Sequence, residues 1–222
     1  MQIQELKSKH QDETVLILGT GPSLNQYSPE QLISIAKGKV CFALKQAYSY
    51  CPSIANYHFL NSANIQPYQY AKPIPIILSL AANEGGWTKS IPHHTLLVVG
   101  DNTNFDDSLS ATHALEKWSL DNTLERPWGP GLFWECVLYS AEYMGFKNIE
   151  TIGVDLGPAG ETTRDHFYGE GFRVNPLSNE ETSNEIELSK AFYHWLSSKD
   201  IEWKVLSEKS YLHQDIPRWR PT

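Results

Sequence analysis

The chain has 222 residues, 41% of them hydrophobic and 20% charged, with a formal net charge of −8. This composition supports a hydrophobic core rather than a disordered chain, and the acidic excess argues against nucleic acid as a partner, because phosphate backbones bind basic faces. No apolar run approaches the ~20 residues that cross a bilayer, and the first residues contain no apolar secretory segment, so we expect a cytoplasmic protein without a transmembrane segment. The three cysteines lack CxxC spacing, which predicts neither a zinc site nor a disulfide framework.

Short apolar runs alternate along the chain with segments of helical periodicity. After the first apolar run, a helix is expected to begin near Ser23 or Ser28. Strands joined by helices indicate an α/β fold, with a Rossmann-like, mostly parallel sheet and helices on both faces. The predicted strands are residues 15–18, 40–44, 57–60, 75–80, 95–99, 149–154 and 203–206, and the predicted helices are residues 29–37, 47–50, 131–144 and 182–199.

Two polar segments interrupt this alternation. Residues 101–128 are irregular, and residues 156–181 are rich in Gly, Pro, Asn and Thr. Long segments without regular structure in a compact domain are often functional loops. We therefore predict a single domain over residues 1–222, with candidate lids at 101–128 and 156–181.

The most informative feature is the turn Gly19-Thr20-Gly21-Pro22-Ser23, which directly follows the apolar run Val-Leu-Ile-Leu. A tight turn between a buried strand and a helix leaves backbone N–H groups unpaired and aimed at one point, where a phosphate fits. Ser23 then acts as the helix cap or donates its hydroxyl to a phosphate oxygen. The third glycine of the dinucleotide fingerprint and the lysine of the ATPase phosphate loop are both absent. The alternative is a strand–helix connection whose two glycines serve only for turning.

Polar residues also follow three other predicted strands. Lys45 follows the second strand, Asn61 and Ser62 the third, and Asp155 the sixth. In parallel sheets, ligands bind outside the carboxyl ends of the strands, so these residues and the glycine turn are expected to meet at one rim. Lys45 is a candidate anion contact there. Asp155 is predicted to orient a base or bind a metal, or else to cap the next turn.

Three sequence blocks carry a resemblance to known enzymes. The first is Ile17–Asn25 with its Gly-Pro-Ser turn, the second combines residues 42–48 and 57–61, and the third begins at Arg126 and continues through residues 141–155, which end in Gly-Val-Asp. In these blocks the chain resembles the bacterial sialyltransferases of glycosyltransferase family 42, and the wider group around the archaeal 6-hydroxymethylpterin diphosphokinase. The blocks are typical of this superfamily but do not separate its members.

The resemblance to the sialyltransferases implies transfer of a sugar of the sialic-acid type from a CMP-activated donor to an acceptor hydroxyl, with inversion and without an obligatory metal. By resemblance, Gly19, Thr20, Gly21, Pro22 and Ser23 hold the phosphate and cytidine. Asn61 matches a donor contact of the family, whereas Lys45 replaces another asparagine. The remaining predicted substrate contacts are Ser62, Gly129, Gly131 and the lid tyrosine Tyr168.

The family's catalytic base is a histidine shortly before the last long helix, where this chain has Asn179-Glu180-Glu181. His166 is the nearest replacement, because an imidazole with a pKa near neutral can accept a hydroxyl proton. The competing interpretation is a loop histidine bound to backbone.

Two alternative functions remain open from the sequence. The diphosphokinase relatives carry an acidic residue after the sixth strand and a downstream histidine, as Asp155 and His166 do here, which implies transfer of pyrophosphate from ATP with Mg²⁺. The other alternative is a nucleotide-binding module without catalysis. The expected partners are a nucleotide-sugar donor and a glycan or small-molecule acceptor.

Overall fold

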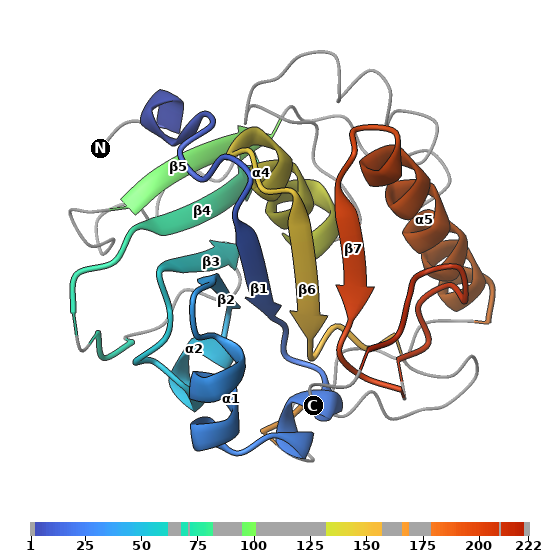
Figure 1. Ribbon diagram of the computed structural model, residues 1–222, viewed down its shortest axis with the longest axis horizontal. Coiled ribbons are helices and arrows are strands. Elements are labelled where there is room, and N and C mark those ends of the chain that lie inside the picture. Colours follow the sequence, from blue (N-terminus) through green and yellow to red (C-terminus); the bar gives the residue numbers. More distant parts are fainter. Residues whose placement is uncertain are drawn as a thin grey trace.

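The computed structural model describes residues 3–61, 68–70, 72–81, 95–100, 132–156, 166–168, 179–208 and 210–219. Within them, seven strands form one sheet in the order β5-β4-β3-β2-β1-β6-β7, and every neighbouring pair is parallel (Figure 1). The strands are β1 (Thr14–Leu18), β2 (Val40–Leu44), β3 (Tyr57–Asn61), β4 (Ile76–Ala81), β5 (Thr95–Gly100), β6 (Asn148–Ile152) and β7 (Glu202–Val205). This confirms the predicted Rossmann-like α/β class.

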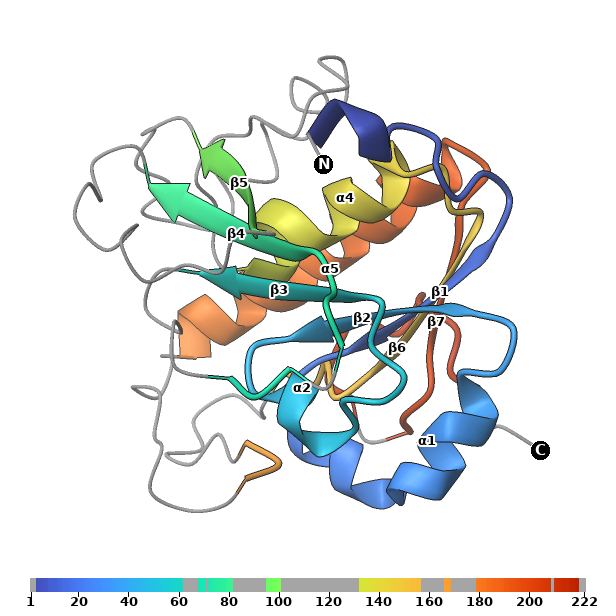
Figure 2. The same cartoon turned by 90° about the vertical axis from the view of Figure 1, so that its left-hand side faces the viewer.

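Helices cover both faces of this sheet, as predicted. Helices α1 and α2 lie on one side, and α4 and α5 lie on the other (Figure 2). Short helices precede β1 and follow it, and a π-helical turn leads into α4. The helical segments are η1 (Ile3–Leu6), η2 (Pro22–Gln26), α1 (Pro29–Ile35), α2 (Ala47–Tyr50), η5 (Phe133–Val137), α4 (Leu138–Tyr143) and α5 (Asn179–Ser197).

The central strand β1 is apolar at every position after Thr14 because both of its faces are buried. Alternate side chains enter two different core clusters. Val15 and Ile17 pack in the cluster that includes α4 and α5, whereas Leu16 and Leu18 pack in the cluster that includes α1 and α2. A continuous run of four apolar residues therefore supplies two cores at once, which explains why it lacks the alternation of a half-exposed strand.

Helix α1 begins where one of the two predicted starts lies. The Ser28 side chain accepts a hydrogen bond from the Gln31 amide at 3.3 Å, and the Gln31 side chain accepts one from the Ser28 amide at 2.8 Å. This reciprocal capping box explains the start at Pro29. At Ser23, the other predicted helix start, the short helix η2 forms instead, and Gly21 rather than Ser23 occupies its cap position.

Other element ends differ from the sequence-based ranges. β6 stops at Ile152, not at residue 154, because Gly153 turns the chain with a φ of +72°. Helix α5 begins at Asn179 and ends at Ser197, rather than covering residues 182–199. The described part of the helix predicted over residues 131–144 opens with the π-helical turn η5 before it becomes α-helical.

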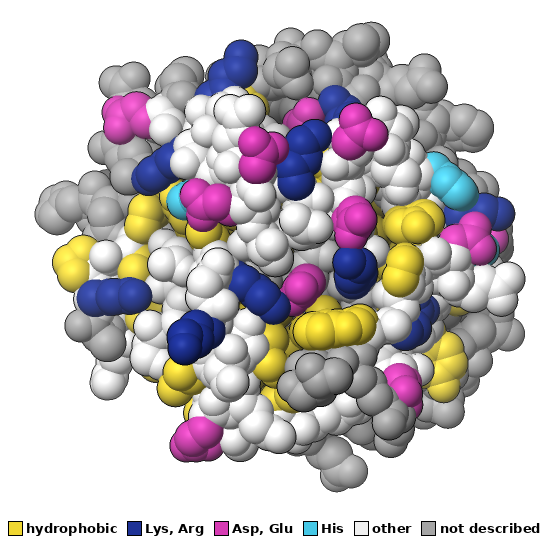
Figure 3. All heavy atoms as spheres, in the orientation of Figure 1, with side chains coloured by type: hydrophobic (Ala, Val, Ile, Leu, Met, Phe, Trp, Pro, Cys, Tyr) yellow, Lys and Arg dark blue, Asp and Glu magenta, His cyan; other side chains and the backbone are white. Residues whose placement is uncertain are grey.

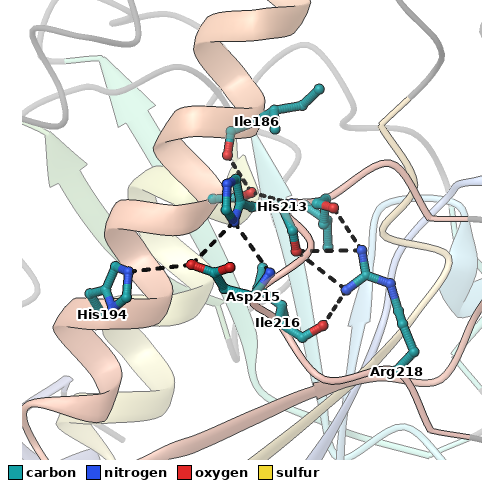
Figure 4. Close-up of polar contacts among 8 residues, drawn as sticks. Ile186, His194, His213, Asp215, Ile216 and Arg218 are labelled. Atoms are coloured by element: carbon teal, nitrogen blue, oxygen red, sulfur yellow. Dashed lines mark hydrogen bonds and ion pairs between the residues drawn. The ribbon is translucent and has the colours of Figure 1, made fainter.

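The segment after β7 returns to α5 and is anchored on it (Figure 4). The backbone N–H of His213 donates to the Ser189 hydroxyl of α5 at 2.9 Å. The Asp215 carboxylate lies 3.5 Å from His213 Nδ1 and 3.7 Å from His194 Nε2. Arg218 donates to backbone carbonyl oxygens of the same segment. These contacts anchor the described part of this segment on α5, and the Trp219 amide donates to Val205 O of β7 at 2.9 Å.

On the face of the molecule seen in Figure 1, acidic and basic side chains of the described residues are interspersed and form no continuous basic surface (Figure 3). None of the described helices is long and apolar enough to cross a membrane.

Candidate functional site

The strand order reverses at β1, which pairs with β2 on one side and with β6 on the other. The α1 crossover to β2 and the α4 entry to β6 lie on opposite faces of the sheet (Figure 2). A cleft of about 200 Å³ opens at the carboxyl ends of these strands, where α/β folds bind ligands. Its lining combines the strand exits, η5 and one lid residue: Gly19, Thr20, Gly21, Leu44, Lys45, Leu132, Phe133, Trp134, Gly153, Val154, Asp155, Leu156 and His166.

Three backbone amides of the glycine turn are bound within the protein. The Gly19 amide donates to Ile152 O and the Gly21 amide to Gly153 O, each at 2.7 Å. The Ser23 amide donates to Asp155 Oδ2 at 2.7 Å. The expectation that this turn offers unpaired N–H groups to a phosphate is therefore wrong for these three amides, because the exit of β6 supplies their acceptors.

The glycines are required by the close approach of the two strand exits. A Cβ on Gly19 would lie 2.2 Å from Gly153 O, and one on Gly21 would lie 2.6 Å from Asp155 Oδ2. Gly153 is restricted in the same way, because its added Cβ would lie 2.5 Å from Gly19 O and its φ is left-handed. The alternative interpretation, a strand–helix connection that needs glycine for its backbone, therefore accounts for both glycines of the motif.

Ser23 also serves the fold rather than the cleft. Its side chain is buried, and its hydroxyl accepts a hydrogen bond from the Gly153 amide at 2.9 Å. Neither Ser23 nor Pro22 lines the cleft. The predicted role of Ser23 as helix cap is wrong for η2, whose cap is Gly21, and its side chain instead joins η2 to the β6 exit; its role as a phosphate donor stays a prediction.

Lys45 lies at the rim where the sequence placed it, and its backbone is unusual. Its φ is +48°, in the left-handed region that a residue with a Cβ rarely adopts. Its amide donates to Phe59 O at 2.8 Å, and its carbonyl accepts a hydrogen bond from His58 Nε2 at 2.8 Å. Strained backbone of this kind is concentrated at functional sites. Lys45 brings a half-buried cation to the cleft.

Sequence reasoning missed His58, which holds this turn from within β3. The residue is fully buried, and burial lowers its pKa to about 4, so the imidazole is neutral near pH 7. The signal in the sequence was a titratable residue inside an apolar strand, which more often indicates a core histidine than a site residue.

Asp155 contributes the carboxylate of the cleft. One oxygen, Oδ2, accepts the Ser23 amide, and burial raises the pKa of this carboxyl despite that hydrogen bond. The other oxygen, Oδ1, is buried and has no hydrogen-bond partner among the described residues. A buried carboxylate oxygen without a partner is costly, so it is a candidate acceptor for a ligand hydroxyl or a proton.

Two lid residues, His166 and Phe167, contact the glycine turn, and a third, Tyr168, stacks on His166. His166 Nδ1 lies 3.3 Å from Thr20 O, and the Phe167 amide donates to the same carbonyl at 2.9 Å. The Asn25 side chain donates to Phe167 O at 2.7 Å. Tyr168 stacks on the His166 ring at 4.9 Å, and burial raises the pKa of its phenol. Because a carbonyl only accepts, His166 carries its proton on Nδ1 in this arrangement, and Nε2 becomes the basic nitrogen.

The remaining predicted contacts are not located by the structure. Asn61 ends β3 at the expected rim, but nothing is described of its side chain. Ser62, Gly129 and Gly131 lie outside the described residues, as do the 101–128 lid and most of the 156–181 lid. In the described part of the chain, no three His, Cys, Asp or Glu side chains are grouped as metal ligands.

No protein-family model and no curated protein matches the sequence. Solved structures that share its fold include two glycosyltransferases. MAf glycosyltransferase from Magnetospirillum magneticum AMB-1 aligns over 99% of this chain with a TM-score of 0.54 and 13% identity, and this chain spans 37% of that protein's length. The sialyltransferase CstII from Campylobacter jejuni, in complex with the substrate analogue cytidine-5'-monophosphate, aligns over 95% of this chain and 86% of its own, with a TM-score of 0.50 and 14% identity. The resemblance to the bacterial sialyltransferases is thus confirmed at the level of the fold.

Proposed function

We propose that the chain is a glycosyltransferase that moves a sugar of the sialic-acid type from a CMP-activated donor to an acceptor hydroxyl. The observation that carries this proposal is the meeting of Lys45, Asp155 and His166 in one cleft at the strand-order reversal. A cation, a carboxylate and a basic imidazole are the groups that a transfer between a phosphate leaving group and a hydroxyl nucleophile requires. The fold shared with two glycosyltransferases supports the same class.

The proposed reaction is a direct displacement, which inverts the configuration of the sugar. The acceptor oxygen forms a bond to the anomeric carbon while the bond from that carbon to the phosphate oxygen breaks. The hydroxyl proton passes to Nε2 of His166, and the bonding electrons leave with the nucleotide phosphate. Lys45 offsets the charge that develops on that phosphate. Asp155 Oδ1 accepts a hydrogen bond from a hydroxyl of the donor.

One observation favours a second candidate, the diphosphokinase. Oδ1 of Asp155, which has no hydrogen-bond partner in the described part of the chain, is a hard oxygen ligand, and Mg²⁺ is commonly held by one carboxylate together with substrate phosphates. In that case ATP binding requires the metal, and His166 takes the proton of the attacking hydroxyl.

Thermal-shift measurements with CMP, CDP, UDP, GDP and ATP, each with and without Mg²⁺, separate these candidates. A ligand present at 100 times its Kd stabilises the fold by about 2.7 kcal/mol. The glycosyltransferase proposal expects CMP to stabilise the protein without metal. Stabilisation by ATP only in the presence of Mg²⁺ supports the diphosphokinase instead, and no stabilisation by any nucleotide overturns both.

Turnover is tested with CMP-sialic acid and a panel of hydroxyl acceptors. We expect His166→Ala to lower the rate at least 100-fold while CMP still binds, because the base acts on the acceptor. His194→Ala is the matched control, since His194 is an exposed histidine on α5 away from the cleft. Binding of CMP without any transfer that depends on His166 supports the non-catalytic module.

A further inference from the structure

We propose that His58 is the positioning residue for Lys45, and that its single ring proton fixes the left-handed turn from which Lys45 enters the cleft. This inference rests on the proposed function for the role of the lysine as a phosphate contact. His58 itself does not line the cleft, so it acts only through Lys45.

The hydrogen bonds define the tautomer of His58. The Lys45 carbonyl only accepts, so His58 Nε2, at 2.8 Å, carries the proton and donates it. A neutral imidazole then has an unprotonated Nδ1, which accepts a hydrogen bond from the Tyr70 hydroxyl at 2.7 Å. Both ring nitrogens therefore have partners inside the protein, with Nε2 as a donor and Nδ1 as an acceptor.

Three tyrosine rings surround the imidazole and restrict its orientation. Tyr48 stacks on it with the ring centres 4.8 Å apart, and Tyr68 meets it edge-on at 4.6 Å. Tyr70 lies tilted at 5.7 Å. A ring enclosed in this way cannot turn its Nε2 away from the Lys45 carbonyl without disturbing the whole cluster.

The backbone of Lys45 is held at both of its polar groups by consecutive residues of β3. Its amide donates to Phe59 O, and its carbonyl accepts a hydrogen bond from His58 Nε2 at 2.8 Å, shorter than the one that it accepts from the Tyr48 amide at 3.3 Å. A left-handed conformation is unfavourable for a non-glycine residue, so the turn persists only where the surroundings impose it. Release of the carbonyl allows the turn to relax, and the ammonium then leaves its place at the rim.

A pair of nearly isosteric variants separates positioning from general damage. The amide nitrogen of Gln in His58→Gln occupies a place similar to Nε2 and keeps the donor for Lys45, whereas Asn in His58→Asn is too short to reach that carbonyl. His10→Asn is the control, because His10 forms a similar imidazole–tyrosine pair with Tyr57 at 2.8 Å outside the cleft lining.

The test is a double-mutant cycle on CMP affinity, measured by calorimetry. We expect Lys45→Met and His58→Asn each to weaken binding about tenfold, and the double variant to bind no more weakly than either single one. His58→Gln and His10→Asn are expected to stay within threefold of the wild-type affinity. A double variant weakened about 100-fold, or a His58→Asn variant with wild-type affinity, overturns the proposal.

A ligand-free readout distinguishes failure of this inference from failure of the proposed function. Exchange of the Lys45 amide hydrogen should accelerate at least tenfold in His58→Asn and remain unchanged in His58→Gln, whether or not any nucleotide binds. For variants that do not fold, the wild-type protein still provides a test by ¹⁵N NMR of the imidazole. The Nε2–H tautomer is expected, and an Nδ1–H tautomer contradicts the proposed hydrogen bond to Lys45.

Discussion

The turn after β1 and the turn after β2 border the same cleft, but different interactions hold them in place. The β1 exit is a backbone structure, in which glycine amides bind the β6 exit and the missing side chains allow the two chains to touch. The β2 exit is a side-chain structure, in which buried His58 holds the strained Lys45. The glycine motif that dominates the sequence therefore builds the wall of the cleft, whereas the charge comes from a lysine that belongs to no familiar motif.

The largest effect is expected where a Cβ enters the contact between the β1 and β6 exits. Gly153→Ala places a methyl group about 2.5 Å from Gly19 O at a left-handed φ, and we expect a loss of stability of about 3–5 kcal/mol. The control is Gly38→Ala, since Gly38 has a φ of +76° and none of the described residues lies within 4 Å of its Cβ position. That variant should lose only about 1 kcal/mol. Equal losses in urea unfolding would show that conformation, not contact, makes glycine necessary.

Because His58 at the β2 exit is buried, we expect the stability of the fold to depend on pH. His58 has a pKa of about 4 in the folded protein and about 6.5 when unfolded, so between these values the unfolded chain binds the extra proton. The contribution of neutral His58 to the free energy of unfolding is therefore fully present above pH 6.5. It is lost as the pH drops toward 4, by about 3 kcal/mol in all.

Urea unfolding at pH 7, 5.5 and 4.5 checks this expectation, with His58→Gln as the comparison. The variant cannot titrate at this position, so its stability should fall less steeply by the amount that His58 contributes. The same slope in both proteins would exclude His58 as the source.

Asp155 binds the Ser23 amide of the glycine turn through Oδ2 and faces the proposed reaction with Oδ1. Its substitution tests whether the buried Oδ1 is retained for function. Burial raises the pKa of the carboxyl, so the ionised form destabilises the fold once the pH exceeds the unfolded value, and the penalty is present at pH 7. Asp155→Asn removes the charge while its carbonyl oxygen still accepts the Ser23 amide. We expect a gain of roughly 0.5–2 kcal/mol together with loss of transfer activity. An Asp155→Asn variant that is less stable than the wild type at pH 7 would contradict the claim that the buried carboxylate destabilises the fold.

The smallest effect on stability is expected at Lys45. Asparagine tolerates the left-handed region better than lysine, so Lys45→Asn should stabilise the fold by up to about 1 kcal/mol. Lys45→Met removes the charge but keeps the conformational strain, so it should lose affinity without gaining stability. Unfolding and calorimetry on the two variants separate strain from charge. A Lys45→Met variant with unchanged CMP affinity would remove Lys45 from the phosphate site.

Much of the site could be predicted because strand exits are local features. Lys45, Asp155 and the glycine turn each follow an apolar run, and parallel strands bring such positions to one edge. The acceptors of the turn could not be predicted. The Gly21 amide and the Ser23 hydroxyl bind Gly153, about 130 residues away, and nothing local distinguishes a satisfied amide from one that awaits a phosphate.

The sequence by itself determined the alternation of strands and helices, the α1 start at Ser28 and the set of charged residues at the rim, because these depend on periodicity, capping and the end of each apolar run. Only the tertiary structure decided which groups remain for a ligand. Packing of β6 against β1 uses the amides of the glycine turn, and packing of β3 against β2 places His58 beneath Lys45. Hydrogen-bond partners are assigned by contacts between distant segments, and those contacts exist only once the sheet has formed.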